Sequence, residues 1–336
     1  MVILPLAIAG LFAAAFGFTA WKARAIEQSY PNHGELIDVG GFRMNSLFVP
    51  AGEDADLPPI VFIHGASGNL RDQETAFRSR LEGRADLLFV DRPGHGYSER
   101  GSERNAWPDG QADTIARLME LRGIESAIIV GHSFGGAIAA SFALGHPERT
   151  AGLLFLAPAT HPWPGGVDWY YDLAKKPYIG WLFSRLVALP AGLVRIDGAT
   201  HSVFHPNPRP EKYVTEGAPA LVLRPRNFRN NAIDVANLNE YVKQVAARYS
   251  SITAPTVVIT GNRDAIVAEE IHSVGLKRDI EHADLVWIDS LGHKPDYVVP
   301  DVAVAALEKL AGHDRDLEAI ARAAEARLRG QSAPRS

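Results

Sequence analysis

Ser133 lies at the centre of the pentapeptide Gly131-His132-Ser133-Phe134-Gly135, which has the form Gly-x-Ser-x-Gly. A short apolar, β-branched stretch precedes it and is typical of a buried strand. A run of small residues follows it and favours a helix. The sequence therefore predicts that Ser133 sits at a tight strand-to-helix turn. Its hydroxyl would project from the sheet, and the first amides of the helix would face the reacting centre.

A serine hydroxyl is a weak nucleophile unless a base takes its proton and an acid orients that base. Candidates for both partners follow strands expected further along the chain. Asp264 ends the sequence Gly-Asn-Arg-Asp after a strand at 256–260, and His293 follows a strand at 285–288. The chain order Ser, Asp, His is the one expected for this type of turn. We therefore predict a catalytic triad of Ser133, Asp264 and His293.

The negative charge that develops on an attacked carbonyl needs backbone N–H donors. One donor is expected to be the amide of Phe134, directly after the nucleophile. The other is expected from the glycine-rich segment 64–68, His-Gly-Ala-Ser-Gly, which follows a strand at 59–63. We assign this second oxyanion-hole donor to Ala66.

The elements that position these residues are short apolar segments that alternate with helical stretches. The apolar segments lie at 59–63, 87–90, 127–130, 153–156, 256–260 and 285–288. Near-continuous apolar strands alternating with helices predict an α/β fold with a mostly parallel sheet and helices on both faces. Ligands bind beyond the carboxyl ends of such strands, where the three triad residues lie. A hairpin with strands at 34–39 and 43–49 is expected before them.

The alternation breaks in the segment 160–250, which lacks strand signals and is rich in aromatic residues. We predict that it is a mainly helical cap insertion over the active edge of a core formed by 34–159 and 251–312. Its rings would suit an apolar or amphiphilic substrate group, or they could serve only to pack the cap onto the core. The charged segment 313–336 is expected to be a C-terminal tail that forms a solvated helix.

The N-terminal segment contains no charged residue from Val2 to Trp21, and Lys22 and Arg24 follow. A helix of this length reaches across a hydrocarbon layer of about 30 Å. We predict that 1–24 is a transmembrane anchor and that a polar linker follows at 25–33. A cleaved signal peptide and a soluble helix are the alternatives. The basic residues after the span favour a catalytic domain on the cytoplasmic side.

The composition excludes several classes of protein. A formal net charge of −5 argues against a nucleic-acid-binding protein, which would carry a basic face. The absence of cysteine excludes disulfides and thiolate metal sites. With no phosphate-binding loop, dinucleotide fingerprint or metal-ligand cluster visible, we predict no cofactor and no metal. Nothing in the sequence indicates an oligomeric state.

The chain resembles the α/β-hydrolase family, in its capped branch with a serine nucleophile, over 34–312. The resemblance is carried by His64-Gly65, by the Asp-Arg-Pro-Gly-His-Gly-Tyr-Ser loop at 91–98, by the turn at Ser133 and by the segments that end at Asp264 and His293. It implies a carboxylic ester hydrolase that forms an acyl-enzyme on Ser133. It also implies structural roles for His95 and His132. Serine at the turn, in place of aspartate, disfavours epoxide hydrolysis and dehalogenation.

Other functions remain open on the same residues. The triad could support C–C bond hydrolysis, amide or peptide cleavage, or cofactor-free perhydrolysis, because a fold does not fix a function. The chain could also be a non-catalytic sensor that binds a small apolar ligand. A structural membrane protein would show no dependence on Ser133.

Overall fold

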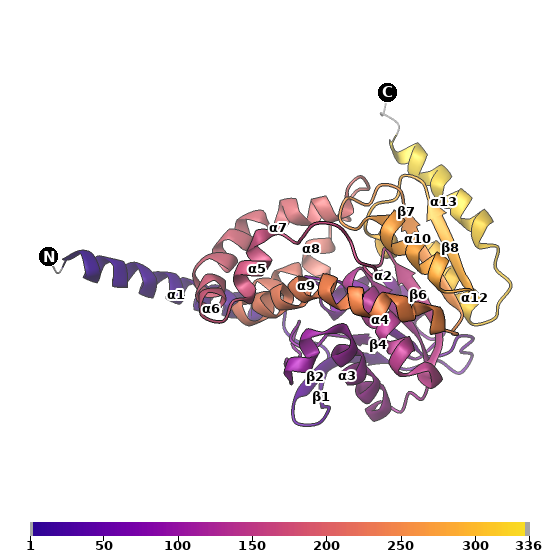
Figure 1. The fold of residues 1–336 in the computed structure, drawn as a ribbon, viewed down its shortest axis with the longest axis horizontal. Helices are drawn as coiled ribbons and strands as arrows, with labels where there is room; N and C mark the ends of the chain where they lie inside the picture. Colours follow the sequence, from indigo (N-terminus) through magenta and orange to yellow (C-terminus); the bar gives the residue numbers. More distant parts are fainter. Residues whose placement is uncertain (1–2, 333–336) are drawn as a thin grey trace.

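A computed structural model describes residues 3–332 and shows one mixed sheet with helices on both faces (Figure 1). The eight strands lie in the order β1-β2-β4-β3-β5-β6-β7-β8. β2 runs antiparallel to its neighbours β1 and β4, and every other pairing is parallel. The strands are β1 Glu35–Asp38, β2 Arg43–Val49, β3 Ile60–Ile63, β4 Leu87–Val90, β5 Ala127–His132, β6 Thr150–Leu156, β7 Thr256–Gly261 and β8 Ala283–Ile288. The predicted fold class is confirmed.

Side chains of successive residues point to opposite faces of a strand, and each face has its own hydrophobic cluster. On β3, Val61 and Ile63 join one cluster, whereas Ile60 and Phe62 join the other. Helices α3 (Pro108–Leu121), α4 (Phe134–Gly145) and α10 (Glu269–Asp279) cover the first face. Helices α2 (Leu70–Leu81) and α12 (Pro300–Leu310) cover the second. Because both faces are covered, the strands read as continuous apolar runs.

The cap is the segment between β6 and β7, and its described secondary structure is entirely helical. It comprises α5 Trp169–Lys175, α6 Pro177–Phe183, η3 Ser184–Ala188, α7 Leu189–Phe204, α8 Tyr213–Glu216, η4 Pro219–Leu223, α9 Pro225–Val245 and η5 Ala246–Ser251. Its longest helix, α9, lies against the core, and α5 and α6 lie further out, toward the N-terminal helix (Figure 1).

The N-terminal helix α1, Ile3–Ser29, extends away from the rest of the molecule (Figure 1). Met1 and Val2, which belong to the predicted anchor, lie outside the described residues. The helix also runs through most of the expected linker at 25–33. It continues there because Ile26 is buried against Leu189 and Leu221 of the cap.

Among the described residues, one helical stretch is long and apolar enough to cross a membrane. It is Pro177–Phe204 in the cap. Only 22% of its most apolar window is buried. A core helix of a soluble protein can pass the same test, so this observation is weak by itself. The anchor at 1–24 stays a prediction.

The C-terminal segment is helical, as expected, but it is docked on the core instead of solvated. It forms α13, Leu317–Ser332, which packs on β8. Leu317, Ala321, Ala324 and Leu328 recur at intervals of three or four residues, form one face of the helix and are buried in the second cluster. The other face carries the charges that suggested a solvated helix.

Candidate active site

Ser133 sits at the turn between β5 and α4 with φ +52° and ψ −118°, in a region that residues with a side chain rarely adopt. Its N–H donates to the Leu156 carbonyl at 3.0 Å, and its own carbonyl accepts from the Gly136 amide at 2.9 Å. A Cβ on Gly131 would lie 2.5 Å from the Gly135 oxygen, and one on Gly135 would lie 2.3 Å from the Ile63 oxygen. The predicted strand–turn–helix is therefore present, and glycine is required on both sides of it.

Asp264 and His293 are hydrogen-bonded to each other. The Asp264 Oδ2 atom accepts from His293 Nδ1 at 2.6 Å, and both side chains are almost fully buried. The other oxygen, Oδ1, accepts from the amides of Ile266 and Val267 at 2.8 and 2.9 Å. An ionised carboxylate only accepts, so the ring proton lies on Nδ1. Nε2 is therefore left to act as a base.

The histidine loop is joined to the residue before the nucleophile. His132 Nε2 donates to the His293 carbonyl at 2.9 Å, and the two imidazole centroids are 5.0 Å apart. In the described chain, no hydrogen bond links the Ser133 hydroxyl to the His293 ring. Such bonds are often long in a free enzyme and shorten when substrate binds. The structure thus brings Asp264 and His293 into direct contact and holds Ser133 beside them through His132.

The segment after β3 lies against the turn at Ser133, since a Cβ on Gly65 would be 3.0 Å from the Ser133 Cβ. The Gly65 carbonyl accepts from His64 Nδ1 at 2.8 Å and from Arg92 Nη2 at 3.3 Å. In a trans peptide the N–H points opposite to the C=O. The Ala66 amide therefore faces away from Arg92. Phe134 is the first residue of α4, so its amide has no acceptor within that helix.

A buried guanidinium contacts the Gly65 carbonyl, which precedes the Ala66 amide, and the ring of Phe134. Arg92 is fully buried, holds the peptide of Ala66 through the Gly65 carbonyl, and lies 4.4 Å from the centroid of the Phe134 ring. Burial lowers the pKa of Arg92 to about 10, an effect that Asp234 partly offsets. Asp234 lies in α9 of the cap, is fully buried and accepts from Arg92 Nη1 at 3.2 Å. The cap therefore supplies the counterion of the group that orients the Ala66 peptide.

A stripe of polar residues on α9 makes further contacts with the core. Asn231 accepts from the Ser67 amide at 2.7 Å and donates to the Ser67 hydroxyl at 3.1 Å. Asp234 also accepts from Arg100 at 2.6 Å. Sequence reasoning missed this stripe, although its spacing of three or four residues was visible, and its buried members are Asn227, Asn230, Asn231, Asp234 and Asn237.

The cap also holds the histidine loop. Asn207 accepts from the Gly292 amide at 2.8 Å and donates to the Ser290 carbonyl at 2.9 Å. The loops that carry Ala66 and His293 are thus both fixed by side chains of the insertion. The sequence predicted a cap over the active edge of the sheet. It did not indicate that side chains of the cap hold the catalytic loops.

The two histidines expected to be structural form defined hydrogen bonds. His95 accepts from Arg92 Nη2 at 3.0 Å and lies 3.2 Å from the Pro93 carbonyl, and His132 donates to His293 as described. Burial lowers the pKa of both rings well below the usual value, so both are neutral at ordinary pH. Neither needs to transfer a proton to make these contacts.

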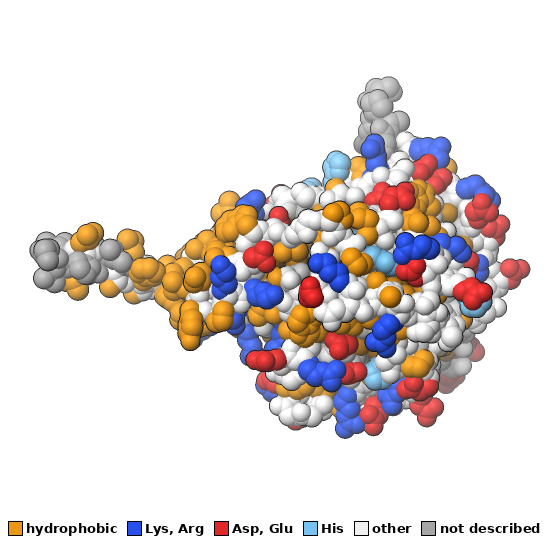
Figure 2. Space-filling view, viewed as in Figure 1, with side chains coloured by type: hydrophobic (Ala, Val, Ile, Leu, Met, Phe, Trp, Pro, Cys, Tyr) orange, Lys and Arg blue, Asp and Glu red, His pale blue; other side chains and the backbone are white. Residues whose placement is uncertain are grey.

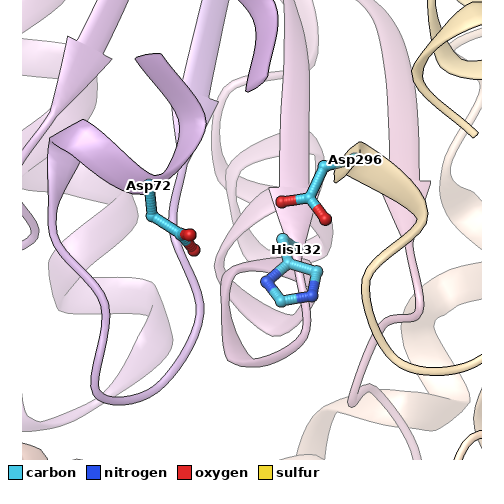
Figure 3. A group of neighbouring side chains, drawn as sticks. All are labelled: Asp72, His132 and Asp296. Carbon is cyan, nitrogen blue, oxygen red and sulfur yellow. The ribbon is translucent and has the colours of Figure 1, made fainter. Parts of the chain in front are cut away.

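A cluster of buried polar residues lies beneath the histidine loop. Asp72, His132 and Asp296 point toward one another (Figure 3), and one ligand atom from each lies within 4.8 Å of the others, as in a metal site. The Lys294 ammonium, however, lies 2.9 Å from an oxygen of each carboxylate. Burial alone would lower the pKa of Lys294, but Asp296 and Asp72 outweigh it and raise that pKa. The lysine already supplies the cation here, and because it directly follows His293 its two ion pairs hold the end of the histidine loop.

Residues 58–295 match the family defined by the α/β hydrolase fold. The chain belongs to that family. This α/β hydrolase is 26% identical to lipase 3 of Moraxella sp. (strain TA144) over 242 residues, which is 70% of this chain and 72% of the lipase.

Two solved structures show how widely this α/β hydrolase shares its fold. The 2-hydroxy-6-oxo-6-phenylhexa-2,4-dienoate hydrolase from Rhodococcus sp. strain RHA1 aligns with a TM-score of 0.65 at 22% identity, over 83% of this chain and 100% of that one. A membrane phospholipase A, described as a bacterial virulence factor, aligns with a TM-score of 0.61 at 22% identity, over 93% of this chain and 98% of that one. At these identities the likeness establishes the fold.

The role of Asp234 can be tested by the variant Asp234→Asn. We expect kcat for a soluble ester to fall by about 10- to 100-fold with little change in KM, because one oxyanion-hole donor contributes about 100- to 1,000-fold and would be displaced rather than removed. The melting temperature should also fall, since a buried guanidinium loses its charged partner. Kinetics measured well below that temperature separate the two effects.

Two further variants frame this test. Asp234→Glu keeps the charge and should recover part of kcat. Asp56→Asn removes the charge from an exposed pair with Arg84 and should leave kcat unchanged. If Asp234→Asn retained the wild-type kcat, Arg92 would not need its cap counterion to hold the Ala66 peptide.

Proposed function

We propose that this α/β hydrolase is a membrane-anchored serine hydrolase of carboxylic esters. In this proposal Ser133 is the nucleophile, His293 is the general base and Asp264 orients the base. The observation that carries it is the buried Asp264–His293 hydrogen bond beside a serine at positive φ. Backbone strain of this kind is found at reactive sites, where the surrounding structure maintains it.

The reaction would proceed in two steps. Ser133 Oγ attacks the ester carbonyl carbon while His293 Nε2 takes the hydroxyl proton, and the amides of Phe134 and Ala66 donate to the oxyanion. The C–O bond to the alcohol then breaks, and His293 returns the proton to the leaving alcohol. Water attacks the resulting acyl-enzyme with His293 again as base, which releases the acid and restores Ser133.

The choice of an ester is supported by the likeness to lipase 3. An apolar or amphiphilic group is favoured by aromatic rings that gather in the cap. The Phe183 and Phe228 centroids lie 6.2 Å apart, and the Trp169 ring lies 6.2 Å from Phe183. These rings also pack α5 and α6 onto α9, so they serve the fold of the cap whatever they bind.

The membrane part of the proposal rests on α1. Its first turns expose Leu4, Leu6 and Leu11, each about two-thirds accessible, and the helix projects from the body (Figure 1). Lys22 Nζ lies 4.5 Å over the ring of Trp21, at the end of the uncharged stretch. Tryptophan followed by a basic residue is typical of a membrane–water interface. Lys22 and Arg24, which follow the span, favour a catalytic domain on the cytoplasmic side in our proposal.

A fluorophosphonate probe and a panel of substrates test the catalytic part. We expect the probe to label the wild-type chain and to leave Ser133→Ala unlabelled, because only an activated serine reacts. Turnover should be greatest with p-nitrophenyl esters and should rise with acyl chain length as more apolar surface is buried. Matched p-nitroanilides and a vinylogous diketone report amide and C–C cleavage.

The other outcomes are equally informative. If the anilide or the diketone turned over faster than every ester, the proposed substrate class would be wrong. The proposed triad would stand. A folded protein without labelling or turnover would point to a ligand-binding protein.

A further inference from the structure

Exposed large apolar side chains gather on one end of the molecule. In the described part of the chain, sixteen such residues are exposed, and only Leu36, Leu121 and Ile266 lie outside α1 and the cap. Six belong to the stretch Pro177–Phe204, and we name them the cap apolar surface: Tyr178, Ile179, Trp181, Leu182, Val187 and Val194. Figure 2 shows hydrophobic side chains running without a break from α1 onto the adjacent end of the cap. A patch of this kind marks an interaction site.

The cap apolar surface is joined to α1 as one body. The Phe16 and Trp181 rings contact at 5.6 Å between centroids, and Thr19 of α1 is 2% exposed. Further along the helix, Glu27 forms an ion pair with Arg224 of the cap at 3.0 Å. The C-terminal half of α1 therefore cannot enter a membrane without bringing this end of the cap to the membrane surface.

The helical rise sets the depth of that contact. Phe16 lies five residues before Trp21, which corresponds to about 7.5 Å along a helix. With Trp21 at the interface, Trp181 beside Phe16 would lie by a similar amount within the bilayer. Amphipathic segments that lie in an interface are immersed by about 5–10 Å, so the depth fits this mode of binding.

We propose that the cap apolar surface lies in the headgroup–acyl boundary of the bilayer that α1 crosses. The inference rests on the anchor in the proposed function and extends it. Lys175, the last residue of α5, and Lys176, which precedes α6, are exposed and form no ion pair within the described chain, so they are available to anionic headgroups. The continuity with α1 favours lipid over a second copy of the chain as the occupant of this surface.

The consequence for substrate is specific. The cap contacts the loops of Ala66 and His293 on its inner side and the bilayer on its outer side. An ester whose acyl chain resides in the membrane could then reach Ser133 without crossing bulk water. The substrate class implied is a membrane-resident amphiphilic ester rather than a water-soluble short-chain one.

The chain has no cysteine, so one introduced cysteine gives one labelled position. We would attach an environment-sensitive fluorophore to the full chain at Ile179→Cys or Val194→Cys on the cap. Phe12→Cys reports α1, and Leu121→Cys on α3 is the matched control with an exposed apolar residue. Each protein is reconstituted in phosphatidylcholine–phosphatidylglycerol vesicles that contain lipids with a quenching doxyl group near the headgroup or near the chain end.

We expect the cap labels to lose about half of their emission with the shallow quencher, the Phe12 label to respond to the deep one, and the Leu121 label to neither. If Phe12 is quenched but the cap labels match Leu121, the anchor stands and the inference is wrong. If no label is quenched and the protein does not float with the vesicles, the anchor and the inference both fail.

A second copy covering the surface would show as energy transfer between labelled cap positions without lipid quenching, which also overturns the inference. Turnover of a soluble ester in the same samples reports folding and the triad. A failure of catalysis is therefore distinguishable from a failure of membrane contact.

Discussion

Replacing Ser133 by alanine is expected to lower kcat/KM for a p-nitrophenyl ester by at least about 10,000-fold, because no other group can form the acyl-enzyme. The backbone of residue 133 should keep its place. Its amide and carbonyl bond to Leu156, Gly136 and Ala159, and none of these contacts uses the hydroxyl. Steady-state kinetics with a circular dichroism spectrum of each variant measure the effect and confirm the fold.

The matched control is Ser141→Ala, in α4, the helix that begins directly after Ser133. Ser141 is also buried, and its hydroxyl bonds to the Ala137 carbonyl at 2.6 Å and to Tyr241 at 2.8 Å. Turnover should stay within about twofold of wild type, since this hydroxyl serves only packing within the core. A Ser133→Ala protein with activity near that of the control would contradict the assignment of the nucleophile.

The variant Asp264→Asn is expected to lower kcat by about 10,000-fold while the fold is kept. Oδ1 of Asp264 accepts from two backbone amides, so the oxygen of asparagine should take that position. Its NH₂ would then face His293 Nδ1 and force the ring proton onto Nε2. A ring with Nε2 protonated cannot take the proton of Ser133. Kinetics across the pH range and the fluorophosphonate labelling rate both measure this loss.

A second histidine–aspartate pair offers the control. His161 Nε2 lies 3.0 Å from Asp279, away from the Ser133 turn, and Asp279→Asn makes the same chemical change there. We expect it to leave kcat nearly unchanged. If kcat fell equally in the two variants, the loss would come from lower stability. Asp264 would then have no catalytic role.

The central strands of the sheet were predictable because they are buried on both faces. The strand at 87–90 was predicted with the bounds that β4 has, since Leu-Leu-Phe-Val is continuous, apolar and ends at a polar loop. Local sequence was less informative at the two ends of the chain. The burial of Ile26 against Leu221 lengthens α1, and the packing of Leu317 on the core means that the C-terminal helix is docked instead of solvated. Both depend on partners far away in sequence.

The triad could be proposed from sequence because each member directly follows a strand whose carboxyl end must lie at one edge of the sheet. The network around Arg92 could not. Asp234 is 142 residues from Arg92, and no sequence motif around either residue indicates that the two are paired. The Arg92 side chain was present in the loop that identified the family. The hydrogen bond from Arg92 to the Gly65 carbonyl depends on the pairing of β3 with β4, which brings the ends of the two strands together. The sequence of the loop alone does not indicate it.

The helices of the cap are held in place by different kinds of contact. Lifting α9 would separate Asp234 from Arg92, and the loss of this buried ion pair opposes the movement. α5 packs mainly on α9 and α6, α6 packs mainly on α5 and η3, and aromatic rings of α5 and α6 contact Phe228 of α9. Lipid tails solvate such groups as well as another helix does. Next to a bilayer, α5 and α6 would therefore move more readily than α9, which would keep Arg92 beside the Gly65 carbonyl.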